Sequence, residues 1–182
     1  GRERLRPDEA YLFLSNHQGY CDAPVLVHAI PRDFRAVMKK EILRIPILSW
    51  VFRHSQFVPL DRRDPVQARA AIEKAAEMLR LGHSFIAFPE GTRSRNGQLG
   101  EFKMGVFVMA LKGGRPIVPV TIRNSRSIQP PGSYVIRPGT VSVQFHDPVP
   151  IEGLSLDERH RLRDSIREII ARGLNAAAGS SR

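Results

Sequence analysis

Residues 11–22 read YLFLSNHQGYCD, and this stretch determines how the rest of the sequence is interpreted. The apolar run Tyr11–Leu14 stops at a Ser-Asn pair, which predicts a short strand followed by a turn. Asp22 then stands where it can cap the N-terminus of a helix that has Pro24 in its first turn and ends near Ile30. A strand that passes through a short loop into a helix is the building unit of α/β proteins.

The same alternation continues along the chain. Further strands are expected at residues 34–38, 56–60, 84–88, 117–122 and 140–145. Helices are expected within residues 41–54, at 65–82 and 106–111, and from 155 onward. We therefore predict an α/β fold, with a single-domain layered structure in which helices flank a mixed, largely buried sheet. The domain is expected to extend over residues 1–182, with its core at about 11–174.

Two of these helices have clear start signals. Asp64 is a suitable cap for the helix at 65–82, Pro65 suits its first position, and Gly82 marks its end. The last helix begins with the pattern of a capping box at residues 155–158.

The composition is that of an ordinary globular protein. The 182 residues include 42% hydrophobic and 25% charged side chains, which excludes a disordered chain. A single cysteine, Cys21, excludes a disulfide framework and a cysteine-rich zinc site, and it fits a reducing compartment. The sequence has no run of eighteen apolar residues, so we expect no membrane-spanning helix.

The positive charge gives the first indication of function. Lys and Arg number 28 against 18 Asp and Glu, which gives a net charge of +10. Seven basic residues and one acidic residue lie between Arg93 and Arg126, so this segment alone carries a net charge of +6. Such a segment attracts nucleic acid, an acidic membrane surface or phosphorylated substrates. The alternative is a basic surface that has no specific partner.

A histidine and a carboxylate five residues apart form the sharpest pattern. His17 follows the first predicted strand, and Asp22 lies at the predicted helix start. A turn eased by Gly19 can fold Asp22 back to the imidazole, where a carboxylate on one ring nitrogen leaves the other nitrogen free to accept a proton. The alternative is a histidine in a turn beside an aspartate that serves only as a helix cap.

The stretch FPEGTRS at residues 88–94 directly follows a predicted buried strand. Loops at this position commonly bind ligands in α/β sheets. Gly91 permits a tight turn, and Arg93 provides a planar guanidinium that suits phosphate. Glu90 is expected to hold Arg93 or to contact a substrate hydroxyl. The alternative is a polar turn with a local ion pair.

Two weaker patterns follow other strands. Arg62 comes just after the strand at 56–60 and is a candidate second phosphate contact, with Asp61 as its internal partner; a solvated charge cluster is the alternative. Pro119 lies inside the predicted strand at 117–122, which indicates a sheet edge or a bulge beside a pocket.

In this order and with these spacings, the sequence closely resembles the glycerolipid acyltransferase family, typified by lysophosphatidate acyltransferase. The resemblance covers about residues 11–174. The family's Asn-His-x4-Asp motif is matched by Asn16, His17 and Asp22, and its Phe-Pro-Glu-Gly-Thr-Arg-Ser motif by residues 88–94. Its Asp-Arg block is matched by Asp61 and Arg62, and its Val-Pro-Val block by residues 118–120.

The resemblance implies transfer of a fatty acyl group from acyl-CoA or acyl carrier protein to the free hydroxyl of lysophosphatidate, which gives phosphatidate without a covalent intermediate. His17 would deprotonate the hydroxyl, and Asp22 would orient His17. The implied substrate-binding residues are Asn16, Asp61, Arg62, Glu90, Gly91, Thr92, Arg93 and Pro119. The thioester is already activated, so we expect no metal site and no cofactor besides this co-substrate.

Two other functions stay open. The same chemistry could act on glycerol 3-phosphate, another lysophospholipid or an amino-acid lysolipid. A basic nucleic-acid-binding module would account for the charge, but only 7% of residues are aromatic and the sequence has no recognisable binding motif. The expected partners are therefore a lysophospholipid, the acyl donor and a membrane surface, with no specific nucleic acid.

A membrane contact is expected in the segment from Ile42 to Phe57. This segment is too short to span a bilayer and contains Arg44 and Arg53, but its apolar residues and Trp50 suit the membrane interface. A pair of ordinary core helices is the alternative. We expect a membrane-associated protein at the cytoplasmic face, in which the family's usual N-terminal membrane-associated segment is missing.

Overall fold

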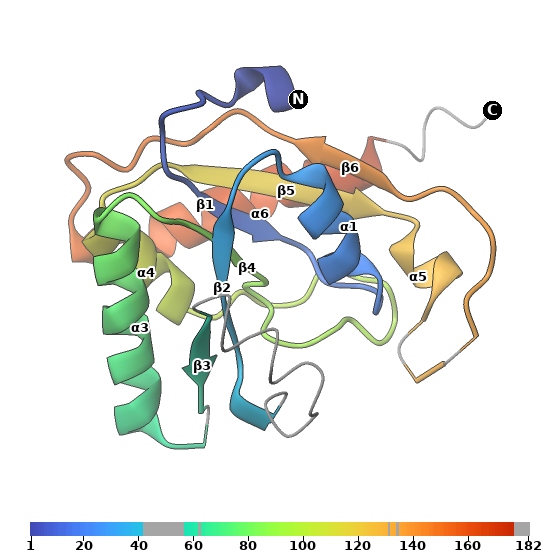
Figure 1. The fold of residues 1–182 in the computed structure, drawn as a ribbon, viewed down its shortest axis with the longest axis horizontal. Helices are drawn as coiled ribbons and strands as arrows, with labels where there is room; N and C mark the ends of the chain where they lie inside the picture. Colours follow the sequence, from blue (N-terminus) through green and yellow to red (C-terminus); the bar gives the residue numbers. More distant parts are fainter. Residues whose placement is uncertain (42–56, 62, 131, 134, 177–182) are drawn as a thin grey trace.

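The structure is a computed structural model that describes residues 1–41, 57–61, 63–130, 132–133 and 135–176. Its centre is a mixed six-stranded sheet with the strand order β3-β2-β4-β1-β5-β6 (Figure 1). The strands are β1 (Leu12–Ser15), β2 (Phe34–Lys39), β3 (Val58–Leu60), β4 (Ser84–Ala87), β5 (Ile117–Arg123) and β6 (Ser142–Phe145). The first five are parallel, and only β6 pairs in the antiparallel direction. The predicted α/β fold is confirmed.

Helices cover both faces of this sheet (Figure 1). The helical elements are η1 (Arg2–Arg4), α1 (Asp22–Ala29), α3 (Pro65–Arg80), α4 (Gly105–Gly113), α5 (Ser125–Ile128), η3 (Leu156–Glu158) and α6 (Arg159–Asn175). Leu12 and Leu14 of β1 belong to a core cluster with α3, α4 and α6, whereas Phe13 belongs to a second cluster with α1. Successive side chains of a strand point to opposite faces, so a strand buried on both sides is largely apolar.

Most element starts follow the local signals in the sequence. The Asp64 carboxylate accepts the backbone N–H groups of Val66 and Gln67 at 2.9 and 3.1 Å and caps α3, as predicted. A capping box forms at residues 155–158 and leads into α6. The short helices η1 and α5 were not predicted. The helices expected within 41–54, and the membrane-contact segment up to residue 56, lie outside the described residues.

The edge position expected for Pro119 is wrong, but the pairing of β5 with the segment after β6 is irregular opposite Pro119. β5 lies inside the sheet, between β1 and β6. Between the pair Val120–Phe145 and the bridge Ile117–Val149, β5 has two residues and its partner segment has three. The missing N–H of Pro119 coincides with this irregular stretch, so the ladder loses no regular hydrogen bond there.

The parallel strands place their carboxyl ends along one edge of the sheet. The segments that begin at Asn16, Lys40, Asp61, Phe88 and Asn124 all leave from this edge. In open α/β sheets, this is the edge where ligands bind. The topology therefore gathers the motifs of the sequence at one end of the molecule. None of the described helices has both the length and the apolar character that crossing a membrane requires.

Gly173 allows α6 to approach the sheet closely. A Cβ at this position would overlap Thr121 Oγ1 and would lie 2.8 Å from His146 Nε2, two groups that are themselves hydrogen-bonded at 2.8 Å. In an unobstructed helix, replacing Gly by Ala gains roughly 0.5–1 kcal/mol. Here we expect Gly173→Ala to lower the Tm instead, measured by thermal unfolding. Ser165→Ala on the exposed side of α6 is the control. A Tm of Gly173→Ala at or above that of the wild type would contradict the close approach.

Candidate active site

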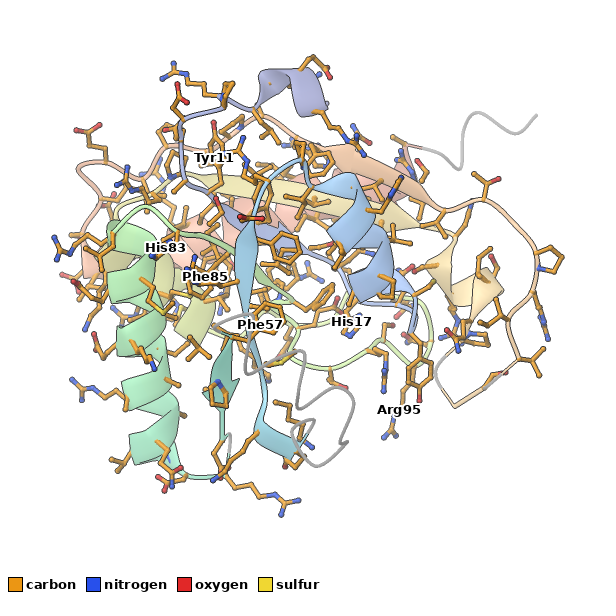
Figure 2. All side chains as sticks on the ribbon, viewed as in Figure 1. Tyr11, His17, Phe57, His83, Phe85 and Arg95 are labelled. Atoms are coloured by element: carbon orange, nitrogen blue, oxygen red, sulfur yellow. The ribbon has the colours of Figure 1, made fainter. Side chains whose placement is uncertain are left out.

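His17 and Asp22 form a hydrogen-bonded pair at the carboxyl end of β1. Figure 2 labels His17. The distance from His17 Nδ1 to Asp22 Oδ2 is 2.7 Å, and the Asp22 side chain is fully buried, while 19% of the His17 side chain is exposed. A carboxylate only accepts, so Nδ1 carries the proton and Nε2 has the free lone pair. The described part of the chain provides no hydrogen-bond partner for Nε2. The imidazole is therefore arranged to accept a proton from outside the protein.

Asp22 holds the turn around it rather than capping its own helix. Its Oδ2 also accepts the backbone N–H groups of Gln18 at 2.6 Å and Gly19 at 2.9 Å. Helix α1 begins at Asp22 itself, with Cys21 as the N-cap residue and no side-chain cap bond. The capping role predicted for Asp22 is wrong, because the turn at Gly19 directs the carboxylate back towards the preceding amides.

Glu90 connects the two main motifs through their backbones. Its Oε1 accepts the N–H of His17 at 2.8 Å, and its Oε2 accepts the N–H of Gly100 at 2.9 Å. Burial raises the pKa of the Glu90 carboxyl, although both amide hydrogen bonds and His17 oppose this rise. The expected contact with Arg93 is not found among the described residues, because both oxygens of Glu90 face backbone amides.

Two further contacts fix His17 to the loop at 88–94. The Phe88 ring stacks on the imidazole, with 4.0 Å between the ring centroids and 16° between their planes. The backbone N–H of Ser94 donates to the carbonyl of His17 at 2.8 Å. Asp22 thus contacts the edge of the His17 ring, and Phe88 contacts its face. The loop at 88–94 also binds the backbone of His17.

Asn16 supports the sheet. Its Nδ2 donates to the carbonyl of Ile122 at 2.9 Å, and its Oδ1 accepts the N–H of Ile122 at 2.8 Å. The side chain is completely buried. The amide, which combines a donor and an acceptor, continues the β1–β5 pairing where β1 ends. The described structure thus gives Asn16 a structural role, and the expected substrate contact stays a prediction.

Arg93 lies beside the His17–Asp22 turn. Its guanidinium carbon is 3.8 Å from the ring centroid of Tyr20, within the distance for a cation–π interaction. Gly91 has a φ of 73°, a conformation that other residues rarely adopt, and this allows the turn before Arg93. Thr92 is exposed at the same turn.

The other predicted substrate contacts are more dispersed. Asp61 accepts the N–H of Arg63 at 3.0 Å and lies 3.7 Å from Lys40 Nζ. Its expected partner Arg62 lies outside the described residues. Pro119 is buried in the sheet opposite Leu14, behind the turn that holds His17. The described residues contain no cluster of three or more His, Cys, Asp or Glu side chains placed to hold a metal ion.

The segment around α5 lies against the site. This contribution was not predicted from the sequence. A Cβ on Gly19 would lie 2.7 Å from the carbonyl oxygen of Ser125, so only glycine allows this approach. Tyr20 N–H donates to the carbonyl of Gln129 at 3.3 Å, and Arg126 Nη1 donates to that of Ser94 at 3.3 Å. A four-residue helix is too short for a periodic signal, and Arg126 contributed only to the count of basic residues.

Residues 1–123 match a family model described as "Acyltransferase". A chloroplastic 1-acyl-sn-glycerol-3-phosphate acyltransferase of Brassica napus is 36% identical over 169 residues, which cover 92% of this chain and 47% of the relative. A chloroplastic enzyme of the same name from Arabidopsis thaliana is 37% identical over 143 residues, covering 78% of this chain and 40% of the relative. The chain thus spans about half the length of these relatives.

A solved structure shows the same fold over the whole chain. The crystal structure of the 1-acyl-sn-glycerophosphate acyltransferase PlsC from Thermotoga maritima superimposes with a TM-score of 0.86 and 32% sequence identity. The match covers 100% of this chain and 71% of that structure. At this identity and coverage, the likeness extends beyond the fold to the sequence.

The bridging role of Glu90 can be tested with an uncharged side chain of the same shape. In Glu90→Gln, one amide N–H, that of His17 or that of Gly100, would face the NH₂ group instead of an oxygen. Leaving a fully buried donor unsatisfied costs about 1–3 kcal/mol, which is the upper range for these part-buried amides. We therefore expect a lower free energy of unfolding, measured by denaturant titration. Glu101→Gln, an exposed neighbour, is the control. Equal stability of Glu90→Gln and the wild type would show that these amides do not depend on the carboxylate.

Proposed function

Because this chain belongs to the acyltransferase family, we propose that it transfers a fatty acyl group from a thioester donor to the free hydroxyl of lysophosphatidate. The product is phosphatidate. The observation that carries the proposal is the 2.7 Å hydrogen bond that holds His17 with Nε2 available as a base. The names of the two plant relatives and of the Thermotoga maritima enzyme support this choice of acceptor.

The reaction needs a base and no protein nucleophile. His17 Nε2 removes the proton of the acceptor hydroxyl while that oxygen attacks the thioester carbonyl. The new ester C–O bond forms, the C–S bond breaks, and the thiolate takes the proton from the imidazolium. Asp22 keeps Nδ1 protonated and stabilises the imidazolium while the proton resides there. The backbone bonds of Asp22 to Gln18 and Gly19 prevent it from turning away.

Cys21 is poorly suited to a covalent mechanism. Burial raises the pKa of its thiol, and the nearby Asp22 raises it further. Its Sγ lies 3.5 Å from the carbonyl of Ser125, to which it donates. A thiol kept protonated is a weak nucleophile, because the thiolate is the reactive form. These contacts support direct transfer to the acceptor hydroxyl.

The acceptor is held by its phosphate in this proposal. Arg93 provides a planar guanidinium within the loop that is hydrogen-bonded to His17, and the turn at Gly91 and Thr92 precedes it. The donor is acyl-CoA or acyl carrier protein, and Arg62 is a second candidate phosphate contact. Lysophosphatidate is an amphipathic lipid, so we place the reaction at a membrane surface, on its cytoplasmic side.

Product analysis by mass spectrometry, with acyl-CoA and a panel of lysolipids and glycerol 3-phosphate, tests the acceptor.

Removing the base should abolish transfer without unfolding the protein. General base catalysis contributes about 10²–10⁴-fold, and the positioning of the hydroxyl at the same site adds to this. We expect the kcat of His17→Ala to fall by at least about 10²–10⁴-fold. The kcat of Asp22→Asn should fall almost as far. Cys21→Ser is the matched control and should keep its activity. Wild-type turnover in folded His17→Ala would refute the mechanism, and an inactive but folded Cys21→Ser would indicate an acyl-cysteine intermediate.

Removing the phosphate contact should change the acceptor's KM. A charge-assisted hydrogen bond contributes about 1.5–3 kcal/mol, so Arg93→Ala should raise this KM roughly 10- to 150-fold. Arg93→Lys should recover only part of it, because a point charge replaces a planar fork. The donor's KM should change far less. Arg161→Ala, an exposed arginine at the start of α6, controls for net charge. Small and equal effects on both substrates would remove Arg93 from the acceptor site.

A further inference from the structure

Tyr20 lies within the four residues that separate His17 from Asp22, and its ring faces Arg93. The guanidinium carbon of Arg93 is 3.8 Å from the centroid of this ring. We propose that Tyr20 is a positioning residue that holds Arg93 in place to receive the phosphate of the acceptor. This inference rests on the proposed function, because it assigns Arg93 a phosphate ligand.

The contact with the ring leaves the donors of Arg93 unused. A guanidinium over an aromatic face is attracted through that face, while its N–H groups point outward in the guanidinium plane. Among the residues that the structure describes, the contact found for the Arg93 guanidinium is the Tyr20 ring, with no hydrogen bond or ion pair. The guanidinium is therefore oriented without losing the N–H groups that a phosphate would need.

An acidic partner would also orient an arginine, but it would neutralise the positive charge locally. Arg80 on α3 shows this arrangement, because its Nε and Nη2 donate to Glu77 at 2.9 and 2.7 Å. Those donors are occupied, and the positive charge is neutralised locally. The neutral ring of Tyr20 leaves the full charge of Arg93 available. An aromatic partner is therefore the better choice for an arginine that must bind an anion.

The backbones of both residues are tied to the catalytic turn. The N–H of Tyr20 donates to the carbonyl of Gln129 at 3.3 Å, and the preceding residue, Gly19, donates to Asp22 Oδ2 at 2.9 Å. On the other loop, the N–H of Ser94, next to Arg93, donates to the carbonyl of His17 at 2.8 Å. One turn thus orients the base through Asp22 and the guanidinium through Tyr20.

The degree of exposure suits a residue at the mouth of a site. Tyr20 is 38% exposed, so one part of its ring reaches solvent while the rest packs on the protein. A ring that served only the core would be buried, as Tyr11 is at 0% exposure. The partly exposed ring is accessible at the surface, where it can hold Arg93 towards a ligand in solvent.

The test compares Tyr20→Phe and Tyr20→Leu with the wild type. Phenylalanine keeps the aromatic face, whereas leucine keeps an apolar side chain without it. We expect Tyr20→Leu to raise the acceptor's KM roughly 2- to 30-fold, the range of a cation–π interaction, with kcat and the donor's KM little changed. Tyr20→Phe should stay close to the wild type. In an Arg93→Ala background, Tyr20→Leu should have no further effect on the acceptor's KM.

Equilibrium binding separates this inference from the proposed function. Calorimetry without an acyl donor uses a short-chain lysophosphatidate and the monoacylglycerol of the same chain length, which lacks the phosphate. Tyr20→Leu should weaken only the phosphate-bearing ligand by the same factor. A protein with this binding pattern but no transferase activity would refute the proposed function and retain the role of Tyr20.

Three outcomes would overturn the inference. One is unchanged lysophosphatidate affinity in folded Tyr20→Leu. A second is equal weakening in Tyr20→Phe, which would assign the effect to the phenol hydroxyl. The third is equal loss of both ligands, which would indicate a general disturbance of the site. Thermal unfolding of each variant shows whether it is folded.

Discussion

The edge of the sheet that carries the candidate site depends on the carboxylate of Asp22. A single oxygen, Oδ2, accepts the imidazole of His17 and the backbone N–H groups of Gln18 and Gly19. An isolated carboxylate is costly to bury, and these three donors offset that cost. The bonds set the path of the chain from β1 to α1 and, at the same time, the direction of the base. Local folding and chemistry therefore share one interaction at this position.

Glu90 extends this arrangement to the second loop. It joins the backbone of His17 to that of Gly100, and Phe88 and Ser94 of the same loop contact the ring and the carbonyl of His17. Segment 16–22 and segment 88–100 therefore behave as one unit, although about seventy residues separate them in the sequence. The α5 segment packs against the turn between His17 and Asp22. There, only a glycine at position 19 leaves room for the carbonyl of Ser125. A base held at its ring and at its backbone needs little reorganisation when a substrate arrives.

The predictions that succeeded rest on short-range physics. Alternation of apolar runs with turn signals indicated the α/β fold, and Asp64 with Pro65 marked the start of α3. The return of Asp22 to His17 also followed from local geometry, because Gly19 permits the turn between them. The expected contact of Glu90 with Arg93 is absent from the described residues, and Asn16, expected at a substrate, has both polar atoms of its side chain hydrogen-bonded to Ile122. Both side chains are buried and satisfy backbone groups.

The sequence by itself determined the fold class, the pairing of His17 with Asp22 and the family, because these depend on residues that are close together or on patterns of many residues. Only the tertiary structure decided that Asn16 bonds Ile122, that Glu90 bonds the amides of His17 and Gly100, and that Tyr20 faces Arg93. These partners are 10 to 106 residues apart in the chain. The parallel sheet brings them to the same edge, and burial there favours hydrogen bonds between groups that no local pattern pairs.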